Sequence, residues 1–250
     1  MKILAIGNSF SEDATTYLHD IAKADGKVCK IVNLYIGGCS LETHWNNVIN
    51  DSSLYAYELN GSNTGQMVSM KEALQEEEWD YVTMQQASGY SGMLETYYPY
   101  IIQLSDYVRQ HAPKVTQLLH QTWAYEIDSQ HPHFVHYDND QKKMYQAIVE
   151  VYQRLSKELS LRVIPCGDVI QALRSHPLFD YEKGGESLCR DGFHMNLIYG
   201  RYALGVTWFA HLFGQSIRHN SYMPPVSGDI TLCPDKLALI KDTVMQTLSY

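Results

Sequence analysis

The chain has 250 residues, 45% of them hydrophobic and 19% charged, which suits one folded α/β domain with a substantial core. Its formal net charge of −9 leaves no basic face able to neutralise a phosphate backbone, so we expect no nucleic-acid partner. The cysteines, at positions 29, 39, 166, 189 and 233, are odd in number and lack C-x-x-C spacing, which argues against a disulfide framework and a zinc ribbon.

The first apolar run ends after a few residues at Gly7 and lacks the long hydrophobic region of a signal peptide. No later stretch approaches the roughly 20 apolar residues that span a bilayer. We therefore expect a cytoplasmic protein without membrane contact. A leader removed from the mature protein would leave the same sequence, so this expectation applies to the chain as it stands.

Short apolar runs rich in β-formers alternate with amphipathic stretches, the pattern of βαβ units and a parallel sheet. The runs predict strands over 2–7, 28–36, 80–84, 114–120 and 161–166. Helices are predicted over 11–23, with Ser11 as N-cap, and over roughly 95–111, 140–158, 196–213 and 234–247. An Asn60-Gly61 turn signal within 54–68 predicts a surface hairpin beside the site.

No internal repeat, low-complexity tract or linker rich in Pro, Gly or Ser interrupts the chain. We therefore predict a single domain over 1–250, of the α/β class, around a central five-stranded parallel sheet. The stretch 175–192 is the longest predicted loop, and long ordered loops in compact domains are often functional.

Polar residues stand where the predicted strands stop. Ser9 follows the first strand, Gly38 the second, and Gln85 with Gln86 the third. Asp191 and His194 come after the fifth strand and its helix. Because ligands of open parallel sheets bind outside the carboxyl ends of the strands, we expect these groups to face one crevice.

Together these groups supply what acyl transfer needs: a nucleophile, a base, a carboxylate that orients the base, and oxyanion donors. Asp191 can accept from Nδ1 of His194 while Nε2 faces Ser9, and Gly192 permits a tight loop. Each pattern alone has an ordinary structural explanation, such as Asp191 capping a helix near Asn196. Their shared position at one end of one sheet favours a serine hydrolase.

At these residues the chain resembles the SGNH hydrolase superfamily, also called GDSL-type esterases and lipases. The GNSFS run at 7–11 is similar to the first conserved block, Gly38-Cys39-Ser40 to the second, and the Asp-x-x-His at 191–194 to the fifth. The resemblance covers nearly the whole chain. It implies a flavodoxin-like three-layer α/β/α sandwich, with the oxyanion held by the backbone amides of Ser9 and Gly38.

The chain departs from this family at the third block. There the family usually has Asn in a Gly-x-Asn-Asp setting, whereas this chain has MQQAS at 84–88. A Gln amide can make the same hydrogen bond, and some carbohydrate-esterase branches of the family look similar here. Gln85, the first polar residue beyond the apolar run, ranks above Gln86 as the third oxyanion donor.

The aromatic residues give an indication of the substrate class. The chain has 19 Tyr and 4 Trp, and aromatic faces suit sugar rings. We expect Trp123, Tyr125 and Ser88 to contact substrate. Similar SGNH proteins often remove acetyl groups from carbohydrates, so a small-molecule ester, an acetylated sugar, is favoured. A thioesterase, a phospholipase or a non-catalytic carbohydrate-binding protein stays open as an alternative, and the oligomeric state is undetermined.

A metal enzyme is the alternative from a different class. His131, His133 and His136 lie within six residues, with His111 and His120 upstream, and histidine is a common zinc ligand. No His-Glu-x-x-His spacing accompanies them. We therefore expect no metal and no cofactor.

Overall fold

The computed structural model describes residues 1–228 and 230–248 and is built on one mixed seven-stranded sheet. The strands are β1 (Lys2–Gly7), β2 (Lys30–Tyr35), β3 (Tyr55–Leu59), β4 (Ser62–Val68), β5 (Tyr81–Met84), β6 (Thr116–His120) and β7 (Arg162–Ile164). The α-helices are α1 (Ser9–Thr15), α2 (Leu18–Ala24), α3 (Leu41–Ile49), α4 (Met70–Gln75), α5 (Tyr100–His111), α6 (Gln141–Leu159), α7 (Cys166–Arg174), α8 (Tyr199–Phe213) and α9 (Pro234–Thr247). Short 3₁₀ turns are η1 (Ser88–Tyr90), η2 (Leu94–Thr96), η3 (Pro132–Tyr137) and η4 (Tyr181–Lys183).

The predicted parallel strands form the centre of this sheet, in the order β2-β1-β5-β6-β7. This is the flavodoxin-like order, in which the chain turns back at β1. Strand β1 is buried from Ile3 to Gly7, because layers cover both faces of a parallel sheet. The Ser9 turn, which follows β1, therefore lies between the chain segments that leave the ends of β2 and β5.

The expectation of a purely parallel five-stranded sheet was wrong, because residues 54–68 extend the sheet. The hairpin forms as the turn signal predicts, with Asn60 and Gly61 at φ 51° and 81°. Its first strand pairs antiparallel with β2, with Val32 opposite Leu59. A Cβ at Gly61 would lie 2.1 Å from the Thr16 carbonyl oxygen, so the turn needs glycine. The hairpin covers the edge of β2 that a five-stranded sheet would leave open.

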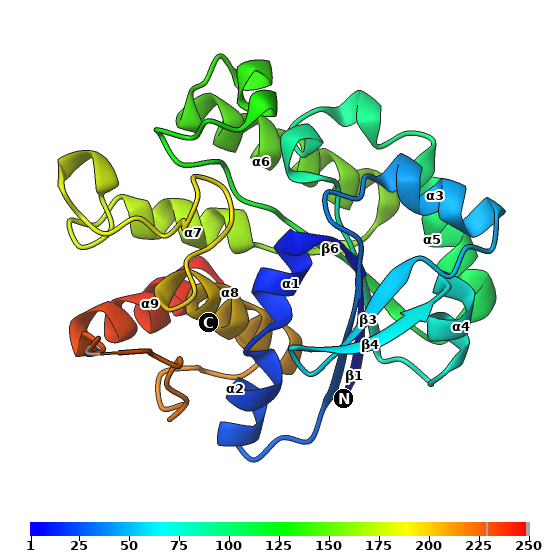
Figure 1. Cartoon of the computed structure of the whole chain (residues 1–250), viewed down its shortest axis with the longest axis horizontal. Coiled ribbons are helices and arrows are strands. Elements are labelled where there is room, and N and C mark those ends of the chain that lie inside the picture. The colour runs from blue at the N-terminus through cyan, green and yellow to red at the C-terminus, as the bar shows by residue number, and fades with distance from the viewer. Residues whose placement is uncertain (229, 249–250) are drawn as a thin grey trace.

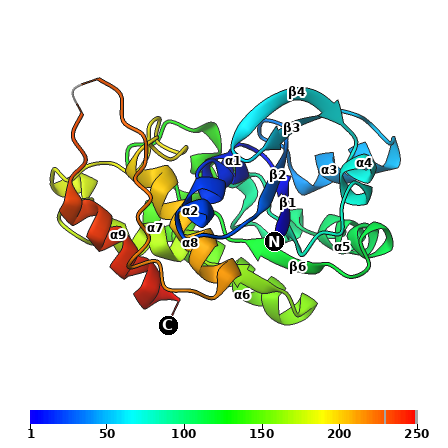
Figure 2. The same cartoon turned by 90° about the horizontal axis from the view of Figure 1, so that it is seen from below.

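Helices cover both faces of the sheet. Figure 1 shows α1, α2 and α8 on one side of the strands and α3, α4 and α5 on the other. Turned by 90°, the molecule shows the same separation, with α9 outside α7 and α8 (Figure 2). Helix α6 belongs with α5, because the Tyr98 hydroxyl in the loop before α5 donates to Glu158. No helix within the described ranges is long and apolar enough to cross a bilayer.

The predicted helix over 11–23 is two helices, and Ser11 is not its N-cap. Asn8 caps α1, because its side-chain oxygen accepts from the Phe10 N–H at 3.0 Å. Ser11 lies in the first turn and closes a capping box by accepting from the Asn8 N–H at 3.0 Å. The hydroxyl of Thr16 donates to the Glu12 carbonyl at 2.7 Å, next to the point where α1 ends. Ser9 is therefore the first residue of a helix.

Candidate active site

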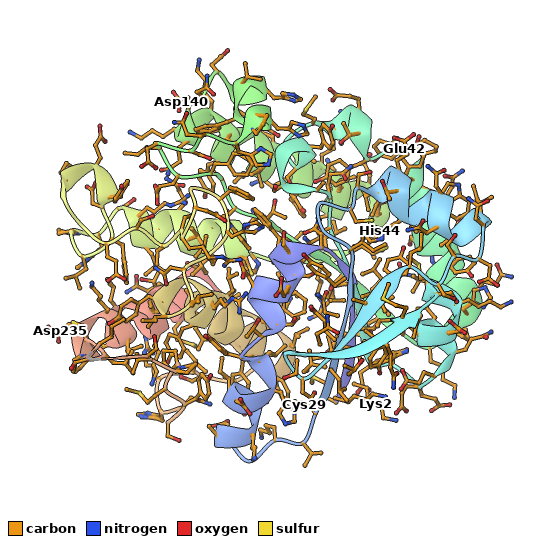
Figure 3. All side chains as sticks on the ribbon, in the orientation of Figure 1. Lys2, Cys29, Glu42, His44, Asp140 and Asp235 are labelled. Atoms are coloured by element: carbon orange, nitrogen blue, oxygen red, sulfur yellow. The ribbon has the colours of Figure 1, made fainter. Side chains whose placement is uncertain are left out.

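The sequence-predicted groups lie at the carboxyl ends of the central strands. In Figure 3, Lys2 marks the amino end of strand β1, and Asp140, in the loop before α6, lies at the opposite end of the molecule. The Ser9 turn follows β1, and the loop carrying Asp191 and His194 precedes α8. Hydrogen bonds join these two segments although they are 185 residues apart in sequence.

Ser9, His194 and Asp191 form one line of hydrogen bonds. The distance from Ser9 Oγ to His194 Nε2 is 2.8 Å, and that from His194 Nδ1 to Asp191 Oδ2 is 2.7 Å. The second carboxylate oxygen of Asp191 accepts from the N–H groups of His194 and Phe193, at 2.8 and 3.2 Å. The base is therefore held in the tautomer that leaves Nε2 free to take a proton from the serine.

The Asp191 carboxylate stays charged at neutral pH. Partial burial acts to raise the pKa of Asp191, but hydrogen bonds from the His194 ring and from the N–H groups of His194 and Phe193 outweigh it and hold this pKa below its ordinary value. The site is also accessible, since the His194 side chain is 20% exposed and that of Asp191 41%. Molecules in the solvent can therefore reach the His194 ring and the neighbouring Ser9 hydroxyl.

Gly38 lies beside the Ser9 turn because the side chain of Asn8 fastens its loop. Asn8 Nδ2 donates to the Cys39 carbonyl at 3.0 Å. Gly38 has φ +63°, a conformation that favours glycine, and no atom lies within 4 Å of a Cβ built there. In the described part of the chain, the N–H groups of Ser9 and Gly38 donate no hydrogen bond, so both are available to an anion.

The amides of Gln85 and Gln86 are already paired within the protein. Gln85 Nε2 donates to Asn8 Oδ1 at 2.9 Å, and its oxygen is hydrogen-bonded to His120 Nδ1. Gln86 Nε2 donates to the carbonyl and the hydroxyl oxygen of Thr96, at 2.9 and 3.1 Å. Burial lowers the pKa of His120 to about 3, so its ring remains neutral. Gln85 thus fixes the residue that precedes the nucleophile.

A buried polar chain that the sequence analysis missed runs beneath the nucleophile turn. The Ser11 hydroxyl donates to Asn33 Oδ1 at 2.7 Å, and Asn33 Nδ2 donates to Glu58 Oε2 at 2.8 Å. All three residues are buried. Burial raises the pKa of Glu58 to about 7, although the hydrogen bond from Asn33 opposes the shift.

Glu58 makes stability depend on pH, and we expect Glu58→Gln to remove part of that dependence. Its folded-state pKa exceeds the unfolded value, so its charged form destabilises the fold as pH rises from about 4.5 to about 7. The Gln variant stays neutral and keeps an oxygen for Asn33. Urea unfolding at pH 8 should find it more stable than the parent by about 2 kcal/mol, with no difference at pH 4.5.

Glu78→Gln serves as the control, because Glu78 is exposed. The variant loses only a surface ion pair with Lys114, so its free energy of unfolding should stay close to that of the parent at both pH values. A Glu58→Gln protein that is less stable than the parent at pH 8 would show that the ionised Glu58 side chain stabilises the fold, which would contradict this prediction.

A second missed feature fastens the His194 loop to α1. The Asp13 carboxylate on α1 is fully buried and accepts from three groups. Arg190 Nη1 donates at 3.0 and 3.1 Å, Arg201 Nε at 2.7 Å and the Met195 N–H at 2.8 Å. Because Asp13 is four residues after Ser9 on the same helix, this contact sets the loop against the helix that begins at Ser9. We name Asp13, Arg190 and Arg201 the loop clamp.

The other side of the loop rests on Glu126. Its N–H donates to the Gly192 carbonyl at 2.7 Å, and its carboxylate accepts from Ser187 Oγ at 2.7 Å. Gly192 has φ +86°, and a Cβ there would lie 3.0 Å from Ser129 Cα. A cleft of about 600 Å³ borders Glu126 on the side of η4 and contains no triad residue.

Two of the expected substrate contacts are packed inside the protein. Trp123 is fully buried, stacks on Phe10 with ring centroids 4.0 Å apart, and donates through Nε1 to the Phe193 carbonyl at 2.8 Å. Tyr125 is also fully buried, and its hydroxyl lies 2.9 Å from Ser88 Oγ. Ser88 is partly exposed. The two rings are therefore part of the core beneath the site, and of the three expected contacts only Ser88 is partly exposed.

The histidines that suggested a metal do not converge on a point. His133 and His136 stack with centroids 5.2 Å apart, and His120 is buried under the sheet end against Trp208. Among residues 1–228 and 230–248, no group of three or more His, Cys, Asp or Glu side chains has an arrangement that could hold a metal ion.

The strand order and the place of the Ser9 turn give an α/β fold that is similar to the folds of solved SGNH and GDSL hydrolases. A protein of Slackia heliotrinireducens described as a candidate SGNH hydrolase has a TM-score of 0.57 and 19% identity, over 85% of this chain and 98% of that one. An acetyl xylan esterase has a TM-score of 0.56 and 13% identity, over 84% and 99%. The expected resemblance is confirmed for the fold.

The chain belongs to the DUF4886 family, a domain of unknown function whose family model matches residues 2–230. A DUF4886 family protein from Bacteroides uniformis has a crystal structure that is similar over 100% of this chain and 95% of that one, with 35% identity and a TM-score of 0.89. No curated protein sequence matches this chain.

Proposed function

We propose that this protein is a serine esterase that removes a small acyl group, acetyl, from a carbohydrate or another small ester. The observation that carries the proposal is the unbroken line of hydrogen bonds from Asp191 through His194 to Ser9. The fold neighbours support the substrate class, since one of them is an acetyl xylan esterase. A thioesterase or a phospholipase would use the same three side chains.

In the proposed reaction, Ser9 Oγ attacks the ester carbonyl carbon while His194 Nε2 accepts the hydroxyl proton. The hydrogen bond from Nδ1–H to Asp191 stabilises the resulting imidazolium. The tetrahedral oxyanion accepts from the N–H groups of Ser9 and Gly38, which are unpaired in the described structure. Gln85 fixes Asn8 and so holds both donors in place.

The carbon–oxygen bond to the alcohol then breaks, and His194 returns its proton to the leaving oxygen. An acyl group remains on Ser9. Water attacks this acyl-enzyme with His194 as the base, and collapse of the second tetrahedral intermediate releases the carboxylic acid and restores the Ser9 hydroxyl. No step requires a cofactor.

A fluorophosphonate probe tests the activated nucleophile directly. We expect Ser9 Oγ to displace fluoride from phosphorus and form a stable adduct, which peptide mass spectrometry locates at residue 9. His194→Ala should lower the labelling rate strongly, because the hydroxyl loses its base. Intact protein that stays unlabelled would instead support a non-catalytic carbohydrate-binding protein.

A further inference from the structure

A row of rings leads away from His194 over the loops that follow β5 and β6. Phe193 lies 4.1 Å from His194 and 4.7 Å from His131, measured between ring centroids. The row continues to neighbouring rings at centroid distances from 4.8 to 6.0 Å. We name the row the ring shelf: Phe193, His131, His133, His136 and Tyr90.

The loop that carries Tyr90 and the loop that carries the three shelf histidines are fastened to each other. The Tyr137 hydroxyl donates to the Gly89 carbonyl at 3.1 Å and accepts from the Gly92 N–H at 3.0 Å. A Cβ at Gly89 would lie 2.4 Å from His133 Nδ1, so glycine is needed for this close packing. The shelf is therefore a built surface with fixed rings rather than a set of loose side chains.

The ring shelf presents aromatic surface to solvent. Tyr90, His131, His133 and Phe193 are partly exposed and His136 is exposed. In the described ranges, no Lys, Arg, Asp or Glu side chain hydrogen-bonds to these rings. Burial lowers the pKa of both His131 and His133, and neighbouring imidazoles add to the effect, so both rings are neutral at pH 7.

The polar edges of the shelf are also oriented. His131 Nδ1 accepts from the His133 N–H at 3.2 Å, which leaves its Nε2 as the N–H donor. Neutral rings with donor and acceptor edges suit a ligand that has an apolar face and a hydroxylated rim. A pyranose ring has this character. The Asp191 carboxylate acts on His131 from the His194 end of the shelf but is hydrogen-bonded to His194, and the rings of His131 and His133 themselves carry no charge that would pair with an ion.

The position of the shelf indicates which part of an ester it meets. Gly38 follows β2, and the shelf loops follow β5 and β6, so the two lie on opposite sides of β1 and Ser9. The oxyanion is expected on the Gly38 side. The leaving oxygen must lie within reach of His194 Nε2, which protonates it, and the shelf begins at His194.

We propose that the ring shelf binds the alcohol part of the ester, and that this alcohol is an uncharged sugar whose pyranose ring stacks on Tyr90 and His133. This assignment rests on the proposed esterase function for the placement of the leaving group. The acyl group lies away from the shelf, so the shelf selects the alcohol and not the acid.

The test compares two esters of the same acid. The parent, Tyr90→Ala and His133→Ala are assayed with acetylated xylobiose and with ethyl acetate, whose alcohol is too small to extend from His194 to Tyr90 and His133. We expect the ratio of kcat/KM for the sugar ester to kcat/KM for ethyl acetate to fall by about 10-fold in each variant. An unchanged ratio in both variants would overturn the proposal.

A matched Tyr–His pair elsewhere in the chain supplies the control. Tyr107 and His111 lie in the C-terminal half of α5 with tilted rings whose centroids are 4.3 Å apart, and neither ring pairs with a shelf ring among the described residues. Tyr107→Ala should keep the parent ratio. Phenyl acetate forms a third arm, and a loss confined to this ester would assign the shelf to an aromatic alcohol and overturn the sugar assignment.

A binding experiment tests the shelf proposal independently of the esterase proposal. Xylobiose, the deacetylated alcohol, is titrated into Ser9→Ala and into Ser9→Ala combined with Tyr90→Ala. A dissociation constant about 10-fold weaker in the second protein supports the shelf even where the parent hydrolyses neither ester. Equal binding by the two proteins overturns the shelf proposal whatever the hydrolysis assays show.

Discussion

Ser9→Ala is expected to lower kcat for acetylated xylobiose by about 10⁴- to 10⁶-fold, because the variant has no oxygen that can form an acyl-enzyme. The oxyanion donors and the alcohol site remain, which accounts for any residual rate above water. Ser9 Oγ bonds only to His194 Nε2 among the described residues, so removing it should leave the free energy of unfolding nearly unchanged.

Ser40→Ala is the matched control, since it removes a hydroxyl from the neighbouring Gly38 loop without touching His194. Ser40 accepts from the Thr43 N–H and caps α3, so we expect a loss of about 1 kcal/mol in stability and a kcat within a few-fold of the parent. Purified Ser9→Ala that hydrolyses the sugar ester at the parental rate would exclude Ser9 as the nucleophile. An acyl-chain series in the same assay would separate an acetylesterase from a thioesterase or a phospholipase.

The parallel strands and the triad candidates could be predicted from the sequence for one physical reason. Strand ends of a parallel sheet meet at one edge, so Ser9 and the Asp-x-x-His pair could be brought together without knowing any distance. The hairpin over 54–68 was predicted from its turn, but its pairing with β2 was not. A turn signal is local, whereas the choice of a sheet edge depends on contacts distant in sequence.

The supporting polar residues escaped prediction because their partners are remote. Asp13 lies in an amphipathic helix and Arg190 is 177 residues away, so nothing local distinguishes Asp13 from a solvated acid. Asn33 and Glu58 interrupt strand patterns and would ordinarily face water, yet they pair with each other in the interior. The one local signal was Asn8, an N-cap type followed three residues later by Ser11.

For the aromatic residues, the sequence analysis expected functional contacts at residues that lie in the core. Trp123 and Tyr125 follow β6 at the correct edge of the sheet, and on that ground they were expected to contact substrate. Both are fully buried, because a large ring at a strand end can equally close the core beneath a loop. The exposed rings come instead from the histidine-rich turn η3, which had suggested a metal.

Asp13→Asn is the change expected to destabilise the fold most, and it tests the loop clamp. The amide keeps the shape of the carboxylate but leaves Arg190 and Arg201 without the buried negative charge that they surround. Breaking a buried ion pair lowers the free energy of unfolding by about 3–5 kcal/mol. Because Arg190 is partly exposed, we expect a loss near the lower of these values. Urea unfolding should therefore find a loss of about 3 kcal/mol.

The same variant should also affect the reaction, because Asp13 accepts from the Met195 N–H, one residue beyond the base. At a temperature where the variant is fully folded, we expect kcat for ethyl acetate to fall by about 10-fold or more, with little change in KM, since small displacements of a base slow proton transfer. Glu12→Gln is the control: it faces Arg201 at 3.6 Å but does not touch the loop, so its effects should stay below about 1 kcal/mol. A variant with lower stability and the parental kcat would show that the clamp holds the fold together without positioning His194.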